Sequence, residues 1–190
     1  CLNPETKINI LDVGAIGDTE KKRWALLGSK ISLHGFEPAE KAFGDLKKGE
    51  INSKYYNIGL SDKSGIQKFY VYNHATINSL LPQKKEVLER YTIYPKKYKK
   101  DALIPLEKTI EINTLSLDDW KLEYNVGEID FINLDCESIE LSVLKSGETV
   151  LKDCLALLVD TTFFTVNERG SRFLELYNYL NSMGFELFDF

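Results

Sequence analysis

The stretch that most constrains the fold of this chain is Lys7–Asp18, KINILDVGAIGD. It opens with an apolar, β-branched run of strand length, which ends at Gly14 and Gly17 before a segment of helical character. Glycine removes a side chain where the backbone must pass close to a ligand, and Asp12 places a carboxylate at the end of the strand. The pattern predicts the first strand, turn and helix of a nucleotide-binding α/β unit. An ordinary tight strand-to-helix turn is the alternative.

A second strand-like run, Ile31–Phe36, is followed directly by Glu37 and Pro38. In Rossmann-like folds an acid at this position accepts hydrogen bonds from both ribose hydroxyls of an adenosine, because a carboxylate offers two acceptor oxygens. We therefore expect Glu37 to hold a ribose. The alternative is a loop acid, or a cap for the helix expected to begin near Ala39.

Lys54–Ile58 predicts a third strand, and Gly59–Asp62 is expected to form the loop beyond it. The carboxyl ends of parallel strands lie along one edge of a sheet, where α/β proteins bind their ligands. A plain turn would also explain the composition of the segment Ser61–Gly65. The polar residues expected together at this edge are Asp12, Glu37, Ser61 and Asp62.

Strands and helices alternate along most of the chain, which predicts an α/β fold with a parallel or mixed sheet and helices on both faces. Further strands are expected at Gln67–Tyr72, Ile110–Thr114, Ile129–Leu134, Cys154–Val159 and Phe185–Phe190. Further helices are expected at Ala39–Lys48, after Ser116, between Glu137 and Gly147, and at Ser171–Met183.

Residues 74–108 interrupt this pattern with lysines, tyrosines and prolines. A long insertion in a compact domain is usually a lid or a binding element. Tyrosine faces stack on sugar C–H surfaces and lysines attract anionic groups, so the segment is a candidate for binding a sugar or an anion. A solvated surface excursion is the alternative.

Composition favours one domain over residues 1–190, and the net charge of −5 argues against a general nucleic-acid-binding surface. The three cysteines are widely spaced without a Cys-x-x-Cys pair, which favours neither a disulfide framework nor a zinc site and fits the reducing cytoplasm. No signal-peptide pattern or membrane-spanning run is present. The acids lack metal-ligand spacing, so no metal site is predicted, although Asp135 and Asp160 at neighbouring strand ends leave a divalent cation conceivable.

Taken together, the motifs resemble the FkbM family of S-adenosylmethionine-dependent methyltransferases. The resemblance covers nearly the whole chain, from Ile10 to Phe190. The blocks that carry it, in order, are LDVGAIGD, GFEP, GLSDKSG with FYVYN, NSLL, LSLDDW, IDFINLDCESIELSVLKSG and GFELF.

This resemblance implies a class I methyltransferase fold, a three-layer Rossmann-like sandwich with a mostly parallel central sheet. It also implies S-adenosylmethionine as the cofactor. By similarity, Glu37 would hold the ribose and Asp135 would lie beneath the sulfonium and the acceptor. The other residues expected to bind the cofactor are Asp12, Gly14, Ala15, Gly17, Asp18 and Pro38 near the methionine and ribose, with Ser61 and Asp62 beside the adenine.

The activity implied by the resemblance is O-methylation of a hydroxyl on a sugar, glycan or related natural product. Asp135 and Glu137 are the candidates for orienting or deprotonating that hydroxyl, and His74 is a further general-base candidate. Glu137 has an alternative explanation, because an acid in the first turn of a helix is favoured by the helix dipole. A lone loop histidine is also often incidental.

The chain departs from the family pattern on the acceptor side more than on the cofactor side. Asn133 stands where a lysine is frequent, Ser138 stands where glycine is usual, and the glycine loop is one residue shorter than in the commonest version. Two other functions stay open. A non-catalytic cofactor-binding module is favoured by Asn133 and Ser138, and a nicotinamide-dependent oxidoreductase is disfavoured by the missing third glycine of a GxGxxG pattern.

Overall fold

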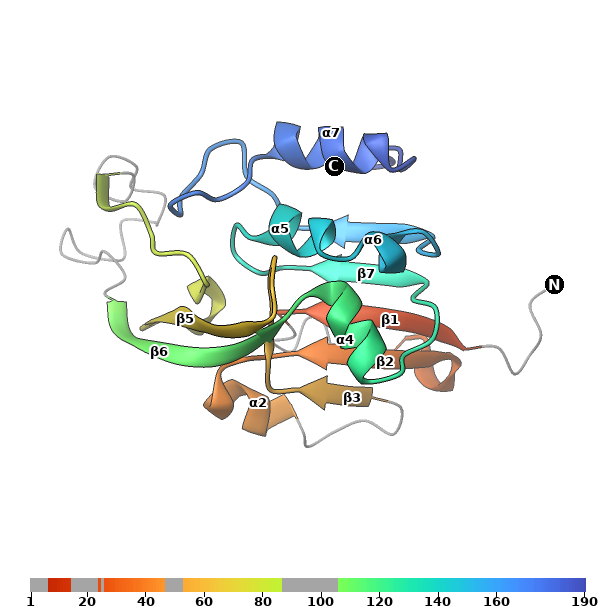
Figure 1. The fold of residues 1–190 in the computed structure, drawn as a ribbon, viewed down its shortest axis with the longest axis horizontal. Helices are drawn as coiled ribbons and strands as arrows, with labels where there is room; N and C mark the ends of the chain where they lie inside the picture. Colours follow the sequence, from red (N-terminus) through yellow and green to blue (C-terminus); the bar gives the residue numbers. More distant parts are fainter. Residues whose placement is uncertain (1–6, 15–23, 25, 47–52, 87–105) are drawn as a thin grey trace.

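The computed structural model describes residues 7–14, 24, 26–46, 53–86 and 106–190. A five-stranded parallel sheet forms its centre, with the strand order β3-β2-β1-β7-β8 (Figure 1). The strands are β1 (Ile8–Val13), β2 (Ile31–Phe36), β3 (Ser53–Tyr56), β7 (Phe131–Leu134) and β8 (Ala156–Val159). The predicted α/β class and the parallel central sheet are therefore confirmed.

The central strand β1 is apolar because both of its faces are covered. Leu11 and Val13 pack in the main core cluster, whereas Ile10 packs in a second cluster with Trp24. Strands buried on both faces have near-continuous apolar sequences, which explains the run that opens the chain. From β1 the chain builds outward through β2 and β3, and then returns to the other side of β1 as β7. The order of strands thus reverses between β1 and β7, and α/β folds bind ligands at such a point.

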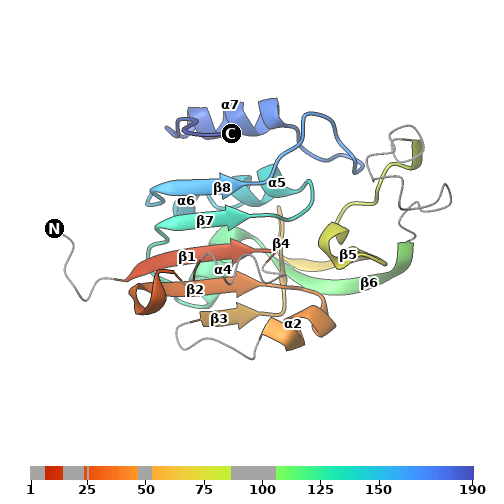
Figure 2. The same cartoon turned by 180° about the vertical axis from the view of Figure 1, so that it is seen from behind.

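One face of the sheet is covered by three helices, α4 (Leu117–Glu123), α5 (Glu140–Lys145) and α6 (Glu148–Leu151), as both views show (Figures 1 and 2). The helix α2 (Glu40–Leu46) contacts β3, and α7 (Phe173–Ser182) contacts α5. The predicted cap of α4 is confirmed, since the Ser116 hydroxyl accepts a hydrogen bond from the Asp119 backbone N–H at 3.1 Å.

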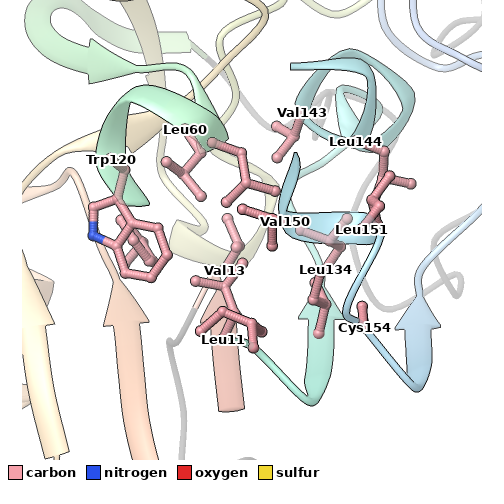
Figure 3. Packing of buried hydrophobic residues seen from close by; sticks show 14 of the residues in the cluster. Leu11, Val13, Leu60, Trp120, Leu134, Val143, Leu144, Val150, Leu151 and Cys154 are labelled. Carbon is pink, nitrogen blue, oxygen red and sulfur yellow. The ribbon is translucent and has the colours of Figure 1, made fainter. Parts of the chain in front are cut away.

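The main core lies between the sheet and these helices (Figure 3). It joins Leu11 and Val13 of β1 and Leu134 of β7 to Trp120, Val143, Leu144, Val150 and Leu151 of the helices. Each such side chain contributes roughly 1.5–3 kcal/mol when fully buried, so the core fixes the positions of the strand ends above it. Those ends carry the residues considered below.

A second, three-stranded sheet has the order β4-β6-β5. Its strands are β4 (Gly59–Leu60), β5 (Gly65–Tyr72) and β6 (Leu106–Leu115). The expectation that Gly59–Asp62 is entirely a loop was wrong, because Gly59 pairs with Thr114 and Leu60 with Leu115. A Cβ atom at Gly59 would lie 3.0 Å from the Ile112 side chain, so the glycine allows this close approach.

The strand expected at Phe185–Phe190 is absent from the structure. Its alternation of apolar and polar residues is typical of a strand, but a strand forms only where another strand offers hydrogen-bonding partners. These residues instead follow α7 without pairing, and the Phe188 side chain is 100% exposed.

Of the insertion predicted at 74–108, the structure describes residues 74–86 and 106–108. These form the short 3-10 helix η2 (Ala75–Ile77) and the start of β6, whereas most of the lysines and tyrosines lie outside the described residues. Its role as a lid or binding element stays a prediction. Among the helices of the described ranges, none is long and apolar enough to cross a membrane.

Candidate functional site

A cavity of about 80 Å³ lies at the carboxyl ends of β1, β2 and β7, where the strand order reverses. We call it the strand-end pocket. Residues that directly follow these strands line it, among them Gly14, Glu37, Pro38, Asp135 and Glu137. Its apolar wall includes Phe36, Ile58, Leu60, Phe69, Leu80 and Ile112, so the second sheet closes one side of the pocket.

Gly14 brings the turn after β1 against the turn after β7. Its φ is +82°, and a Cβ atom there would lie 1.9 Å from the Asp135 carbonyl oxygen. The Gly14 N–H also donates to the Phe36 carbonyl at 3.3 Å, which ties the turn to β2. Only glycine meets both the backbone angle and the close approach, so this position explains one of the glycines singled out in the sequence.

Glu37 lines the strand-end pocket and is only 1% exposed. Its Oε1 accepts a hydrogen bond from the Ala39 N–H at 2.6 Å. Burial raises the pKa of this carboxyl from 4.5 to about 7, although the hydrogen bond from Ala39 opposes the rise. Glu37 directly follows β2, as the sequence predicts, and its role in holding a ribose stays a prediction.

Asp12 lies beneath the turn and does not line the pocket. Its carboxylate is buried, and it accepts hydrogen bonds from Trp24 Nε1 at 3.0 Å and from Asn133 Nδ2 at 2.7 Å. Asn133, which departs from the family pattern, is therefore the partner of Asp12 on the neighbouring strand. The sequence did not predict this hydrogen bond, because it does not show the register in which Asp12 of β1 pairs with Asn133 of β7.

The backbone after β7 has an uncommon conformation. Glu137 and Ser138 have φ values of 55° and 79°, in the left-handed region that costs a non-glycine residue on the order of 1 kcal/mol or more. Two N–H groups of this turn, those of Cys136 and Ser138, donate to Glu140 Oε1 at 3.1 Å each. The buried carboxylate of Glu140 therefore stabilises the turn through these two backbone N–H groups.

Two segments distant in the sequence, at Ser79 and at Asn167, also hydrogen-bond to this turn. The Ser79 hydroxyl donates to the Glu137 carbonyl at 2.8 Å, and Asn167 Nδ2 donates to it at 3.2 Å. Backbone strain persists only where surrounding contacts over-determine it, and such strain clusters at functional sites. The contacts around Glu137 meet this description.

The Glu137 side chain lines the strand-end pocket and also a second cavity beside it. The described residues provide no hydrogen bond to its carboxylate. Burial raises its pKa to about 8, and the charges of Asp135, Asp160 and Glu140 add to the rise. An unpartnered carboxyl of raised pKa in a cavity wall is a candidate for proton transfer.

The second cavity, which we call the acidic pocket, measures about 100 Å³. Three acids line it, namely Glu137, Glu140 and Asp160. The other lining residues are Ile77, Gln83, Ser138, Thr161, Thr162, Val166 and Ser171. From the sequence, Asp160 was noted with Asp135 at neighbouring strand ends, as a pair that left a divalent cation conceivable. In the described part of the chain, no group of three or more His, Cys, Asp or Glu side chains is arranged to hold a metal ion.

The remaining predicted residues lie outside both pockets or outside the described residues. Ser61 is buried and donates to Asp62 Oδ1 at 2.9 Å, but only their neighbours Gly59 and Leu60 line the strand-end pocket. His74 is exposed, with its Nδ1 2.8 Å from the Thr76 hydroxyl, and it lines neither pocket. Ala15, Gly17 and Asp18 lie outside the described residues. The proposed roles of these residues stay predictions.

Comparison with known proteins gives one family and one curated relative. The model of the methyltransferase FkbM domain matches residues 12–187. The 2-O-methyltransferase NoeI of Sinorhizobium fredii (strain NBRC 101917 / NGR234) is 24% identical over 151 residues, which are 75% of this chain and 58% of that protein. No solved structure matches the chain at a significant level. The family resemblance seen in the sequence is confirmed.

Proposed function

The chain belongs to the FkbM methyltransferase domain family, and from that premise we propose that it transfers a methyl group from S-adenosylmethionine to a hydroxyl oxygen of a sugar, glycan or related natural product. The observation that carries the proposal is the position of Glu137. Its carboxyl, which accepts no hydrogen bond from the described residues, lines both the strand-end pocket and the second, polar cavity.

The strand-end pocket fits the cofactor in three respects. Glu37 offers a buried carboxylate to the ribose hydroxyls, and Gly14 leaves the backbone of the first turn without a side chain. The apolar wall, with Phe69 and Ile112, gives a surface against which a purine ring packs. Asp135 lies at the pocket end nearest β7, where the positive sulfonium group would meet the acids of this edge.

Once bound, S-adenosylmethionine supplies the methyl group as a sulfonium electrophile. Glu137 would orient the acceptor hydroxyl toward that methyl group and take up the hydroxyl proton on its carboxylate. Holding the oxygen in line with the methyl group accounts for most of such catalysis. The strained, well-supported turn fixes Glu137 for both tasks, orientation and proton removal.

The choice of oxygen as the acceptor is supported by the relative, whose name states 2-O-methyl transfer. The present chain spans 58% of the length of that protein. Both the sugar or glycan acceptor and the dependence on S-adenosylmethionine are parts of the proposed function.

The first test is calorimetric titration of the purified chain with S-adenosylhomocysteine, with NADH as the control ligand. We expect binding of S-adenosylhomocysteine alone, and weakening by about tenfold or more in Glu37→Ala, because two hydrogen bonds from a ribose to a charged group are lost. A matched control is Glu186→Gln, which removes an exposed carboxylate elsewhere. Binding of NADH alone, or an unchanged affinity in Glu37→Ala, would overturn the assignment of this pocket.

A second measurement separates turnover from binding. Methyl transfer to hydroxylated acceptors is followed with a labelled methyl donor, in the parent chain and in Glu137→Gln. We expect transfer in the parent and its loss in the variant. Cofactor binding with no transfer to any hydroxylated acceptor would instead support the non-catalytic module.

A further inference from the structure

Two segments that lie far apart in the sequence close the acidic pocket. The backbone N–H of Lys84 donates to Val166 O and that of Glu168 donates to Pro82 O, each at 2.8 Å, and Gln83 and Asn167 form an isolated β-bridge. The Gln83 N–H is also held by the Tyr72 hydroxyl at 3.0 Å. The wall that carries Gln83 is thus fixed by backbone hydrogen bonds.

Two side-chain oxygens of residues that line this pocket are buried and receive no hydrogen bond from the described part of the chain. They are Gln83 Oε1 and the Thr162 hydroxyl, and both residues line the cavity. A buried polar atom without a hydrogen bond is costly, and in native proteins it commonly marks a place where a ligand or water binds. The two orphaned atoms are an observation separate from the carboxylates, and they indicate the same cavity.

The ionisable groups of the pocket are all carboxyls in the described part of the chain. Its ionisable lining residues are Glu137, Glu140 and Asp160, and no Lys, Arg or His is among the described residues that line it. The amide oxygen of Gln83 adds an acceptor. A ligand that carries positive charge is attracted to these acids when they are ionised, whereas a carboxylate or phosphate is repelled by them.

We propose that the acidic pocket binds the methyl acceptor, and that it selects an acceptor with an ammonium group near the reacting hydroxyl, as in an amino sugar or amino alcohol, over an anionic one. This inference rests on the proposed function, since it assigns the acceptor to the cavity that shares Glu137 with the strand-end pocket. An acceptor in that cavity lies beside Glu137, the side chain proposed to take its hydroxyl proton.

The ammonium group has a second consequence in this pocket. Burial and the charges of Asp135, Asp160 and Glu140 raise the pKa of Glu137 to about 8, so most of this carboxyl is protonated near neutral pH. A bound cation opposes this repulsion and favours the ionised form, which is the form that accepts a proton. A cationic acceptor therefore prepares its own general base.

The test uses the chain saturated with S-adenosylhomocysteine and three matched ligands, glucosamine, glucose and glucose 6-phosphate. Their dissociation constants are measured by saturation-transfer NMR titration. We expect glucosamine to bind about tenfold more tightly than glucose, the scale of one partly screened charge interaction, and glucose 6-phosphate to bind most weakly. Equal binding of the three, preference for the phosphate, or no binding of any would overturn the proposal.

A variant locates the selectivity. Asp160→Asn removes one carboxylate of the acidic pocket and leaves the strand-end pocket untouched. We expect the ratio of glucosamine to glucose affinities to fall about threefold or more, with S-adenosylhomocysteine affinity unchanged, while Glu186→Gln changes neither. An unchanged ratio in Asp160→Asn would contradict the inference. Failure of S-adenosylhomocysteine to bind the parent chain would instead contradict the proposed function, so the two failures are distinguishable.

Discussion

The strand-end pocket and the acidic pocket share Glu137 but are built in different ways. The first combines residues that directly follow strands of the central sheet, such as Gly14 after β1 and Glu37 after β2, with residues of the second sheet and of the segment around η2. The second needs a bridge between Gln83 and Asn167 and the segment after β8. The functional side chains of the first pocket thus follow directly from strand-to-turn geometry, whereas Gln83 reaches the second pocket only through a contact between distant parts of the chain.

The two pockets also differ in what they offer a ligand. The strand-end pocket has an apolar wall and one buried carboxyl, Glu37, which suits a purine and a ribose. The acidic pocket has three acids and two orphaned oxygens, which suit a ligand rich in hydrogen-bond donors. The difference teaches that the cofactor side and the acceptor side can be changed separately, and each prediction below changes one side and measures both.

The largest effect is expected from Glu137→Gln. The amide keeps the size of the side chain but cannot take the hydroxyl proton, so methyl transfer should fall by about 10²–10⁴-fold. S-adenosylhomocysteine affinity should change by less than about threefold, or under 1 kcal/mol. Single-turnover methyl transfer and calorimetric titration measure the two quantities. Equal losses in both would mean that Glu137 serves the cofactor pocket only.

Gly14→Ala should damage the opposite side. The new methyl group would lie 1.9 Å from the Asp135 carbonyl oxygen on a backbone with a φ of +82°, so the turn must shift. We expect a loss of roughly 3 kcal/mol or more in the free energy of unfolding, or an equivalent loss of S-adenosylhomocysteine affinity. Thermal unfolding and calorimetry measure these effects.

Gly44→Ala is the control for that substitution. Gly44 lies inside α2 with nothing within 4 Å of an added Cβ atom, so alanine should stabilise the chain by about 0.5–1 kcal/mol. If Gly14→Ala behaved like Gly44→Ala, the close contact between the turns after β1 and β7 would be disproved.

The residues that could be predicted from the sequence are those whose positions depend on local patterns. Gly14 and Glu37 were recognisable because a buried strand followed by glycine or acid is a local pattern. Ser61 and Asp62 were placed less well, because Gly59 and Leu60 pair with Thr114 and Leu115, more than fifty residues later. Such pairing leaves no signal near the loop itself.

The acidic pocket was harder still to predict. Nothing in the sequence around Gln83 indicates its bridge to Asn167, and the hydrogen bond between Asn133 and Asp12 depends on the register of two strands. The strand expected at Phe185–Phe190 failed for a related reason, since alternation of apolar residues cannot supply a pairing partner.

The pH dependence of the rate of methyl transfer should distinguish the two pockets. Burial and neighbouring acids raise the pKa of Glu137 to about 8, so its proton-accepting, ionised fraction grows about tenfold per pH unit below that value. The rate of methyl transfer at saturating cofactor should therefore rise with pH, with an inflection above the usual 4.5 and at or below about 8, because a bound cation lowers the pKa. Rates measured from pH 5 to 9 test this.

The matched control for the pH profile is Glu37→Gln. Glu37 also has a raised pKa, about 7, but it lies on the cofactor side. Its substitution should change the concentration of cofactor needed for half-maximal rate and leave the inflection at saturating cofactor in place. An inflection that disappears in Glu37→Gln and persists in Glu137→Gln would reverse the roles assigned to the two acids.

The smallest effect is expected from Ser138→Gly, in the turn that both pockets share. Its φ of 79° favours glycine, so the substitution should raise the free energy of unfolding by up to about 1 kcal/mol. Asn125→Gly is the control, because Asn125 has a φ of 49° at the end of α4, away from both pockets. Chemical denaturation measures the free energy of unfolding of both variants.

If the strained turn serves to position Glu137, Ser138→Gly should also lower the rate of methyl transfer by a fewfold at unchanged cofactor affinity, whereas Asn125→Gly should not. A more stable Ser138→Gly chain with undiminished transfer would mean that the hydrogen bonds from Ser79 and Asn167 are sufficient to hold Glu137, and that the strain has no part in the reaction.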